Sequence, residues 1–132
     1  MTQALAVDEL QNMSFLELSA EYARLSGQEC SLALSVRLVW EECCEWFDEV
    51  EPTDGSVVNN PEWELKELAD IQVCITNRAR LMNYDLVAAT KRVYMNNIGR
   101  MHQPDGTIIR REGDNKIMKN LEYPKVTLSD LT

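Results

Sequence analysis

The stretch Trp40-Glu41-Glu42-Cys43-Cys44-Glu45-Trp46 places carboxylates three or four residues apart, which is the repeat of an α-helix. A second stretch, Glu64-Leu65-Lys66-Glu67-Leu68-Ala69-Asp70, shows the same spacing. Each stretch should therefore present its acids on one side of a helix. If the two helices face each other, the acids form a cage for hard divalent cations.

The helix that carries the first stretch is expected over residues 29–48. One broad side is apolar and could supply a core: Leu32, Val36, Val39, Trp40, Cys43 and Phe47. A second side begins with Leu34 and Leu38 and continues into the acids Glu41 and Glu45, with Glu42 nearby. The acids thus extend an apolar stripe inward. Because an isolated buried carboxylate is costly, this placement predicts compensating cations.

Capping signals predict three further helices. Ser14 and Glu17 form a capping box at the start of residues 14–25, and Gly27 can end that helix. Asn60 before Pro61 predicts a helix over 61–82. A fourth is expected over 85–101, after a break at Asn83.

The tail after residue 101 differs from the helical region. Residues 107–111 and 116–118 have the composition of short strands, and the Gly113-Asp114-Asn115 turn between them predicts a small hairpin. The chain should then run extended to Thr132. With 132 residues, we expect a single all-α domain over 1–132, with core helices over about 14–101 and a tail over 102–132.

Composition excludes several classes of protein. A net charge of -9 argues against a nucleic-acid polymer as partner. No apolar run is long enough for a membrane span and no signal-like N-terminus is present, so we expect a cytoplasmic protein with no membrane partner. The four cysteines lack paired spacing, and His102 is the single histidine, which favours reduced thiols and disfavours zinc.

The acids match the chemistry of Mg²⁺ or Mn²⁺, which prefer oxygen ligands. Glu41-Glu42-x-x-Glu45 and Glu67-x-x-Asp70 together offer five carboxylates, which suits two or more ions per site. Such ions can hold a nucleoside triphosphate on an acidic protein and stabilise charge on its phosphates. Glu64 shares a stripe with Glu67 and Asp70, and the sequence leaves open whether it joins the ions or faces solvent.

The two motifs in this order resemble the signature EExxE followed by ExxD of the MazG-like all-α nucleoside triphosphate pyrophosphohydrolases. The resemblance covers residues 32–100. It implies a four-helix bundle-type fold, assembled as a homodimer or homotetramer, that hydrolyses a (deoxy)nucleoside triphosphate to the monophosphate and pyrophosphate. By the same match, the implied metal ligands are Glu42, Glu45, Glu67 and Asp70, and Glu41 is a ligand or the catalytic base that orients water.

Candidates for substrate binding come from the helical spacing and from the family resemblance. Asn77, two turns beyond Asp70, could bond sugar or phosphate or have an ordinary interior role. The resemblance implies phosphate contacts from Lys91, Asn97 and Arg100, although Lys91 and Arg100 fall on opposite sides of an ideal helix. Four aromatic side chains could stack on a base or belong to the core: Phe15, Trp46, Trp63 and Tyr84.

The identity of the base and the class of protein have alternatives. A dGTP enzyme would need acceptors for guanine, which residues near the first helix could supply: Asp8, Glu9, Asn12 and Glu17. A di-iron carboxylate bundle would need Glu-x-x-His pairs, which this sequence lacks. A non-catalytic acidic helical protein that binds metal or a partner would use the same acids structurally.

Overall fold

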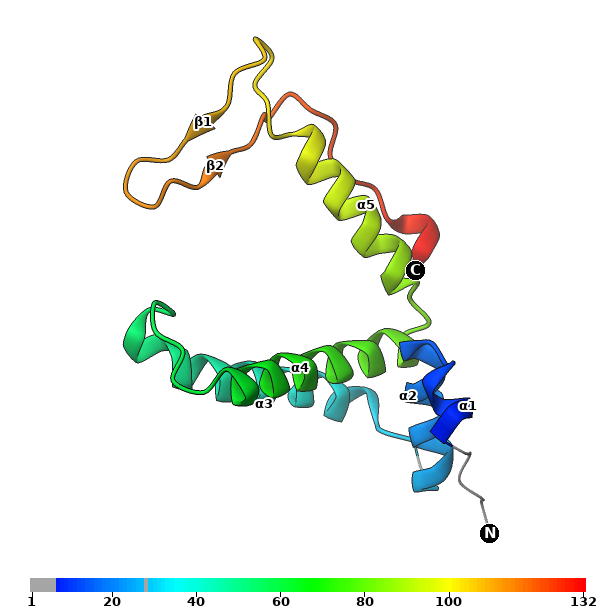
Figure 1. Ribbon diagram of the computed structural model, residues 1–132. Helices are drawn as coiled ribbons and strands as arrows, with labels where there is room; N and C mark the ends of the chain where they lie inside the picture. Colours follow the sequence, from blue (N-terminus) through cyan, green and yellow to red (C-terminus); the bar gives the residue numbers. More distant parts are fainter. Residues whose placement is uncertain (1–6, 28) are drawn as a thin grey trace. The chain divides into compact units, whose positions relative to one another are not determined.

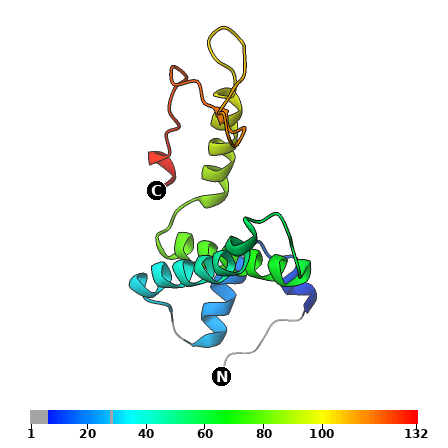
Figure 2. The ribbon, with the colours of Figure 1, turned by 90° about the vertical axis from the view of Figure 1, so that its left-hand side faces the viewer.

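The computed structural model describes residues 7–27 and 29–132 (Figures 1 and 2). This part of the chain contains five α-helices and one small antiparallel sheet, so the predicted mostly helical fold is confirmed. The chain divides into two compact units, one ending at Tyr84 and the other beginning at Asp85. No helix in the described ranges is long and apolar enough to cross a membrane.

The first unit contains four helices: α1 (Val7–Gln11), α2 (Phe15–Ser26), α3 (Leu32–Val50) and α4 (Pro61–Leu81). A 3-10 turn, η1 (Glu51–Thr53), follows α3. Helices α3 and α4 lie side by side and run in opposite directions, and α2 packs on α4 (Figures 1 and 2). This antiparallel pair brings the two acidic stretches to the same part of the unit.

The predicted caps form. The side chain of Ser14 accepts a hydrogen bond from the backbone N–H of Glu17, whose carboxylate accepts from the backbone N–H of Ser14. Gly27 ends α2 with φ of 80° in the left-handed region, which glycine adopts without steric cost. Asn60 caps α4 by accepting from Trp63 N at 3.0 Å.

Most helix boundaries differ from the prediction by one to three residues, and α3 ends at Val50 rather than at residue 48. Helix α3 begins at Leu32 rather than residue 29, because the side chain of Ser31 accepts from Leu34 N at 3.1 Å and fixes the start there. The fourth predicted helix, α5, ends at Gly99 rather than at residue 101. The five-residue helix α1 was not expected from the sequence.

The apolar side of α3 does not form a core within one chain, contrary to the prediction. Leu32, Val36 and Phe47 are each more than half exposed, and Trp40 is 68% exposed. Ala79 is the one apolar residue that is buried in the described part of the chain. The other buried residues there are polar: Ser35, Glu67 and Thr76.

The second unit contains α5 (Leu86–Gly99), β1 (Ile109–Arg110), β2 (Ile117–Met118) and η2 (Ser129–Leu131). The hairpin pairs Ile109 with Met118, which confirms the predicted hairpin. The remainder was expected to be extended, but it contains a turn at 121–123 and the turn η2. It returns along α5, where Arg92 makes two bonds to Asp130, at 2.6 and 2.7 Å. A Cβ on Gly99 would collide with the outer end of the Tyr123 ring, so a larger residue there would require this side chain to shift.

Candidate metal centre

Three of the predicted acids meet where α3 lies against α4. Glu42 comes from α3, and Glu67 and Asp70 come from α4. One carboxylate oxygen from each residue lies within 4.8 Å of the other two. Glu67 is 6% exposed, and the other two are half-buried. These three residues are called the acidic triad below.

The acidic triad has too few cationic partners for its charge. Oε2 of Glu42 and Oε2 of Glu67 are buried and have no hydrogen-bond partner in the described structure. Burial raises the pKa of Glu42, and the nearby negative charges of Glu45, Asp70 and Glu67 raise it further. Lys66 lies on the exposed side, with Nζ 2.7 Å from Asp70 Oδ2. One surface ammonium thus faces three carboxylates, an imbalance that a divalent cation would correct.

The other predicted acids lie around the acidic triad. Glu45 is exposed and lines a cavity of about 400 Å³ together with Glu67 and Trp63. Glu41 is exposed and does not join the acidic triad. The carboxylate of Glu64 accepts from Trp46 Nε1 at 3.3 Å.

The expectation that Glu41 and Glu45 extend a stripe inward is wrong for the single chain. It relied on Leu34 being buried, whereas Leu34 is 42% exposed. The more buried side of α3 runs instead through Ser35, Leu38 and Glu42. The acid that turns toward α4 is therefore Glu42, and the roles of Glu41 and Glu45 as ligands stay predictions.

The predicted substrate-binding residues fall in both units. Asn77 lies on α4 with the acidic triad. Lys91 is exposed on α5 and Asn97 is half-buried there, both in the second unit. Arg100 follows the end of α5, and its Nε is buried without a hydrogen-bond partner among the described residues. Of these four residues, the structure brings only Asn77 into the unit that holds the acidic triad.

A larger cavity of about 590 Å³ lies between α2, α3 and α4 and is called the apolar cavity below. It begins beside the acidic triad, because Ala69 and Cys74 line it and flank Asp70 along α4. Burial raises the pKa of the Cys74 thiol, and the charges of Glu42 and Asp70 raise it further. Most of the lining is hydrocarbon, from Phe15, Leu18, Tyr22, Ala23, Leu38 and Val73 among others.

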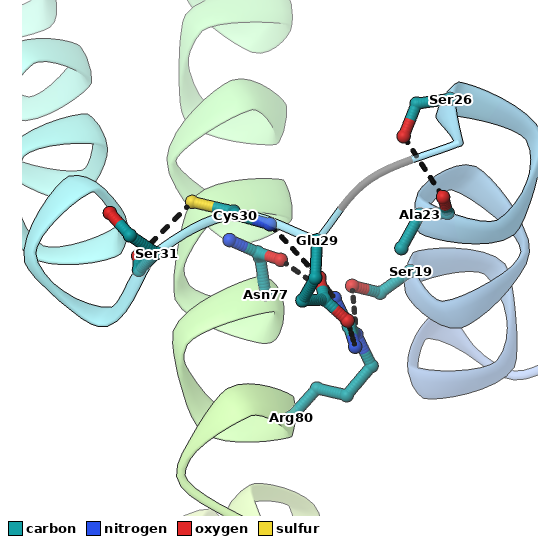
Figure 3. A network of polar contacts seen from close by, with 8 residues as sticks. All are labelled: Ser19, Ala23, Ser26, Glu29, Cys30, Ser31, Asn77 and Arg80. Carbon is teal, nitrogen blue, oxygen red and sulfur yellow. Dashed lines mark hydrogen bonds and ion pairs between the residues drawn. The ribbon is translucent and has the colours of Figure 1, made fainter.

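Figure 3 shows a polar network, and its members Ser19, Glu29 and Asn77 line the end of the apolar cavity away from the acidic triad. Arg80 on α4 donates to both carboxylate oxygens of Glu29, at 2.6 and 2.7 Å, and to Ser19 Oγ on α2, at 3.0 Å. It also donates to Asn77 Oδ1 at 3.0 Å. No pattern in the sequence predicts this network, because its members are up to 61 residues apart in the chain.

The four cysteines are half-buried and none is paired in a disulfide within the described residues. No protein-family model, curated protein or solved structure matches the chain. An assignment of function therefore depends on the chemistry of the acidic triad and of the two cavities.

Proposed function

We propose that the protein is a metal-dependent (deoxy)nucleoside triphosphate pyrophosphohydrolase. The observation that carries this proposal is the convergence of Glu42, Glu67 and Asp70 within 4.8 Å, with buried carboxylate oxygens that lack a partner in the described residues. The order of the two acidic motifs supports it, and so does the apolar cavity beside them, which offers space for the rest of a nucleotide.

The carboxylate oxygens of the acidic triad fit Mg²⁺ or Mn²⁺ as metal ligands. All three side chains of the acidic triad offer hard oxygen ligands, and histidine and thiolate ligands of the kind that select softer metals are not part of it. Glu45 borders the cavity that Glu67 lines, so it is in place to serve a second ion. A bound divalent ion supplies Lewis-acid stabilisation of phosphate oxygens and lowers the pKa of water.

The remaining residues have the following proposed roles. Glu41 orients the attacking water and accepts its proton, or serves as a further ligand. Water adds to the α-phosphorus, the bond from that phosphorus to the bridging oxygen breaks, and pyrophosphate leaves. Asn77 holds the nucleoside side of the substrate, and Lys91, Asn97 and Arg100 contact phosphate from the same subunit or from a neighbouring one.

The experiment is an assay of pyrophosphate release from each of the eight common ribo- and deoxyribonucleoside triphosphates, with Mg²⁺ or Mn²⁺ and a chelator control. We expect release of the monophosphate and pyrophosphate in equal amounts, abolished by the chelator. Turnover that persists in the chelator, or release of inorganic phosphate in place of pyrophosphate, would contradict the proposal. The relative rates also test the proposal of a dGTP-directed enzyme.

The second candidate is a non-catalytic acidic helical protein that binds metal or a partner. The exposed apolar side of α3 favours it, because such a surface suits an interaction. Stabilisation by Mg²⁺ without turnover of any nucleotide would support this candidate over the enzyme.

We also propose that the protein is a homodimer or homotetramer. Leu32, Val36 and Trp40 recur every four residues along one side of α3 and are exposed, so a second copy could cover them. Sedimentation analysis should give a mass of two or four chains. Trp40→Glu should lower this mass, and a monomeric unaltered protein would contradict the proposal.

A further inference from the structure

We propose that Arg80 is a positioning residue for base recognition. It orients the amide of Asn77 so that the apolar cavity selects a nucleobase by an edge with two adjacent hydrogen-bond acceptors. The choice of a nucleobase rests on the proposed function. The orientation of Asn77 rests on the geometry alone.

The first step is the direction of the Asn77 amide. Arg80 Nη2 lies 3.0 Å from Asn77 Oδ1. A guanidinium group has donors and no acceptor, so the atom of Asn77 that faces it must be the oxygen. The amide nitrogen then points away from Arg80, as Figure 3 shows.

Arg80 cannot easily move to allow the other orientation. Its two terminal nitrogens bind the two oxygens of Glu29, and its Nε binds Ser19 Oγ. Its side chain is 15% exposed. The planar, two-pronged geometry of this contact holds the guanidinium in one position, which in turn holds the amide of Asn77.

The second step is the polarity of this end of the apolar cavity. Asn77 lines the cavity, and its Nδ2 has no hydrogen-bond partner within residues 7–27 and 29–132. Ser19 Oγ accepts from Arg80, so its hydroxyl hydrogen is left to donate. Both oxygens of Glu29 accept from Arg80, and Oε1 also accepts from the backbone N–H of Cys30. This end of the cavity therefore offers hydrogen-bond donors to a ligand.

Gln72 and Thr76 contribute a second polar pair on α4. Gln72 Nε2 donates to Thr76 Oγ1 at 3.3 Å, which leaves the hydroxyl hydrogen of Thr76 as another donor. The side-chain oxygen of Gln72 is an acceptor, but Gln72 is an exposed residue. The more buried polar groups of the lining are thus donors.

A flat aromatic ring is the kind of ligand that fits the volume and the hydrocarbon lining of the apolar cavity. Asn77 follows Asp70 by seven residues, which is two helical turns or about 10 Å on the same side of α4. A nucleotide with its phosphates at the acidic triad would place its base toward Asn77.

The hydrogen-bond donors near Asn77 would discriminate between the four bases. Guanine offers the adjacent acceptors O6 and N7, and cytosine offers O2 and N3. Adenine places an amino group beside its ring nitrogens, and thymine places N3–H beside each carbonyl, so each would leave donors facing donors. A site that bonds polar groups discriminates strongly against a ligand that leaves them unpaired.

The test compares base preference in variants that keep the shape of the cavity. Asn77→Asp replaces the donor with an acceptor of the same size. We expect kcat/KM for the preferred base to fall by about tenfold or more, chiefly through a higher KM, and the preference among dCTP, dGTP, dATP and dTTP to flatten or reverse. Arg80→Lys, which cannot bridge three partners, should flatten the preference in the same way. The matched control is Asn59→Asp in the exposed loop before α4, which should change nothing.

A purely structural role for Arg80 and Asn77 predicts a different result. It would lower turnover equally for all four bases and leave their ranking unchanged, which would overturn the proposal. Thermal unfolding of each variant, measured in parallel, separates loss of folded protein from loss of base preference.

A binding experiment separates this inference from the proposed reaction. Saturation-transfer NMR with dCMP, dGMP, dAMP and dTMP in the presence of a chelator measures base preference without metal or turnover. Preferential saturation of dCMP or dGMP, lost in Asn77→Asp, would support the inference even if no triphosphate is hydrolysed. Equal saturation of all four would overturn it. Absence of saturation, with a lower assembly mass for Asn77→Asp, would show that a second copy fills the cavity and would also overturn it.

Discussion

Two sites along α4 differ in how their charges are balanced. At the first site, in the middle of the helix, the acidic triad gathers three carboxylates against a single surface lysine, and two carboxylate oxygens lack partners in the described structure. At the second site, near the C-terminal end of the helix, Arg80 joins Glu29, Ser19 and Asn77, and all of its nitrogens have acceptors. The pKa of Glu42 is raised by burial and by its acidic neighbours, whereas the pKa of Glu29 is lowered by its bonds from Arg80.

The charges of the Arg80 network are balanced within the chain, whereas those of the acidic triad need a ligand to balance them. A buried polar group normally has a hydrogen-bond partner in the protein or in ordered water. Where the chain supplies the partner, as at Arg80, the group fixes local geometry. Where it does not, as at Glu67, the missing partner is expected from outside. Four experiments test this difference.

The largest effect is expected from Glu67→Gln. The change removes one ligand charge from the most buried member of the acidic triad while keeping its shape, so turnover should fall by at least about a hundredfold. Pyrophosphate release measures it, and circular dichroism should show unchanged helical content. Glu62→Gln, on the exposed first turn of the same helix, is the matched control. Asp70→Asn and Glu45→Gln should behave like Glu67→Gln, and full activity in Asp70→Asn would exclude this site.

The second effect is stabilisation by a divalent cation. At a free concentration 100 times its dissociation constant, Mg²⁺ should raise the free energy of unfolding by about 2.7 kcal/mol, because it binds the folded state alone. Glu67→Gln should lose this gain, and Arg80→Lys should retain it. Denaturant titration with and without chelator gives the value. An equal response in both variants would mean that the ion binds elsewhere.

A smaller effect, again a stabilisation, is expected from Glu42→Gln in the absence of metal. The variant removes a negative charge from a crowded, half-buried position, so the chelated protein should become more stable, with an unfolding midpoint higher by roughly 3 °C. Differential scanning calorimetry in chelator provides the measurement. Destabilisation would show that Glu42 has an internal partner.

The smallest effect is expected from Glu29→Gln, which removes the charge that pairs with Arg80 near the C-terminal end of α4. The lowered pKa of Glu29 means that its ion pair contributes stability above the ordinary carboxyl pKa of 4.5, and that this contribution is lost as the pH falls through the lowered value. The variant should therefore unfold about 2 °C lower at pH 7. The difference from the unaltered protein should vanish in acid. A difference in unfolding midpoint that stays constant with pH would mean that the effect comes from packing and not from the ion pair.

Local sequence signals predicted the helices well because their causes are local. Ser14, Gly27 and Asn60 act on atoms three or four residues away, so the sequence alone contains their partners. The spacing also predicted an acidic side on each of the two helices, whereas the meeting of these sides was only a condition of the predicted cage. The rotation of α3 did not follow from local signals, because it depends on contacts with α4, and it decided that Glu42 rather than Glu41 turns inward. The Arg80 network required residues distant in sequence to meet.

The scarcity of buried hydrocarbon in one chain has a calorimetric consequence. Ala79 is the only apolar residue buried among those described, and exposure of apolar surface is what raises the heat capacity on unfolding. A lone chain should therefore unfold with a heat-capacity increment well below the usual ~12–15 cal/mol/K per residue. An increment of ordinary size, with a midpoint that rises with protein concentration, would mean that the hydrocarbon of α3 is covered by association and that folding and assembly are one transition.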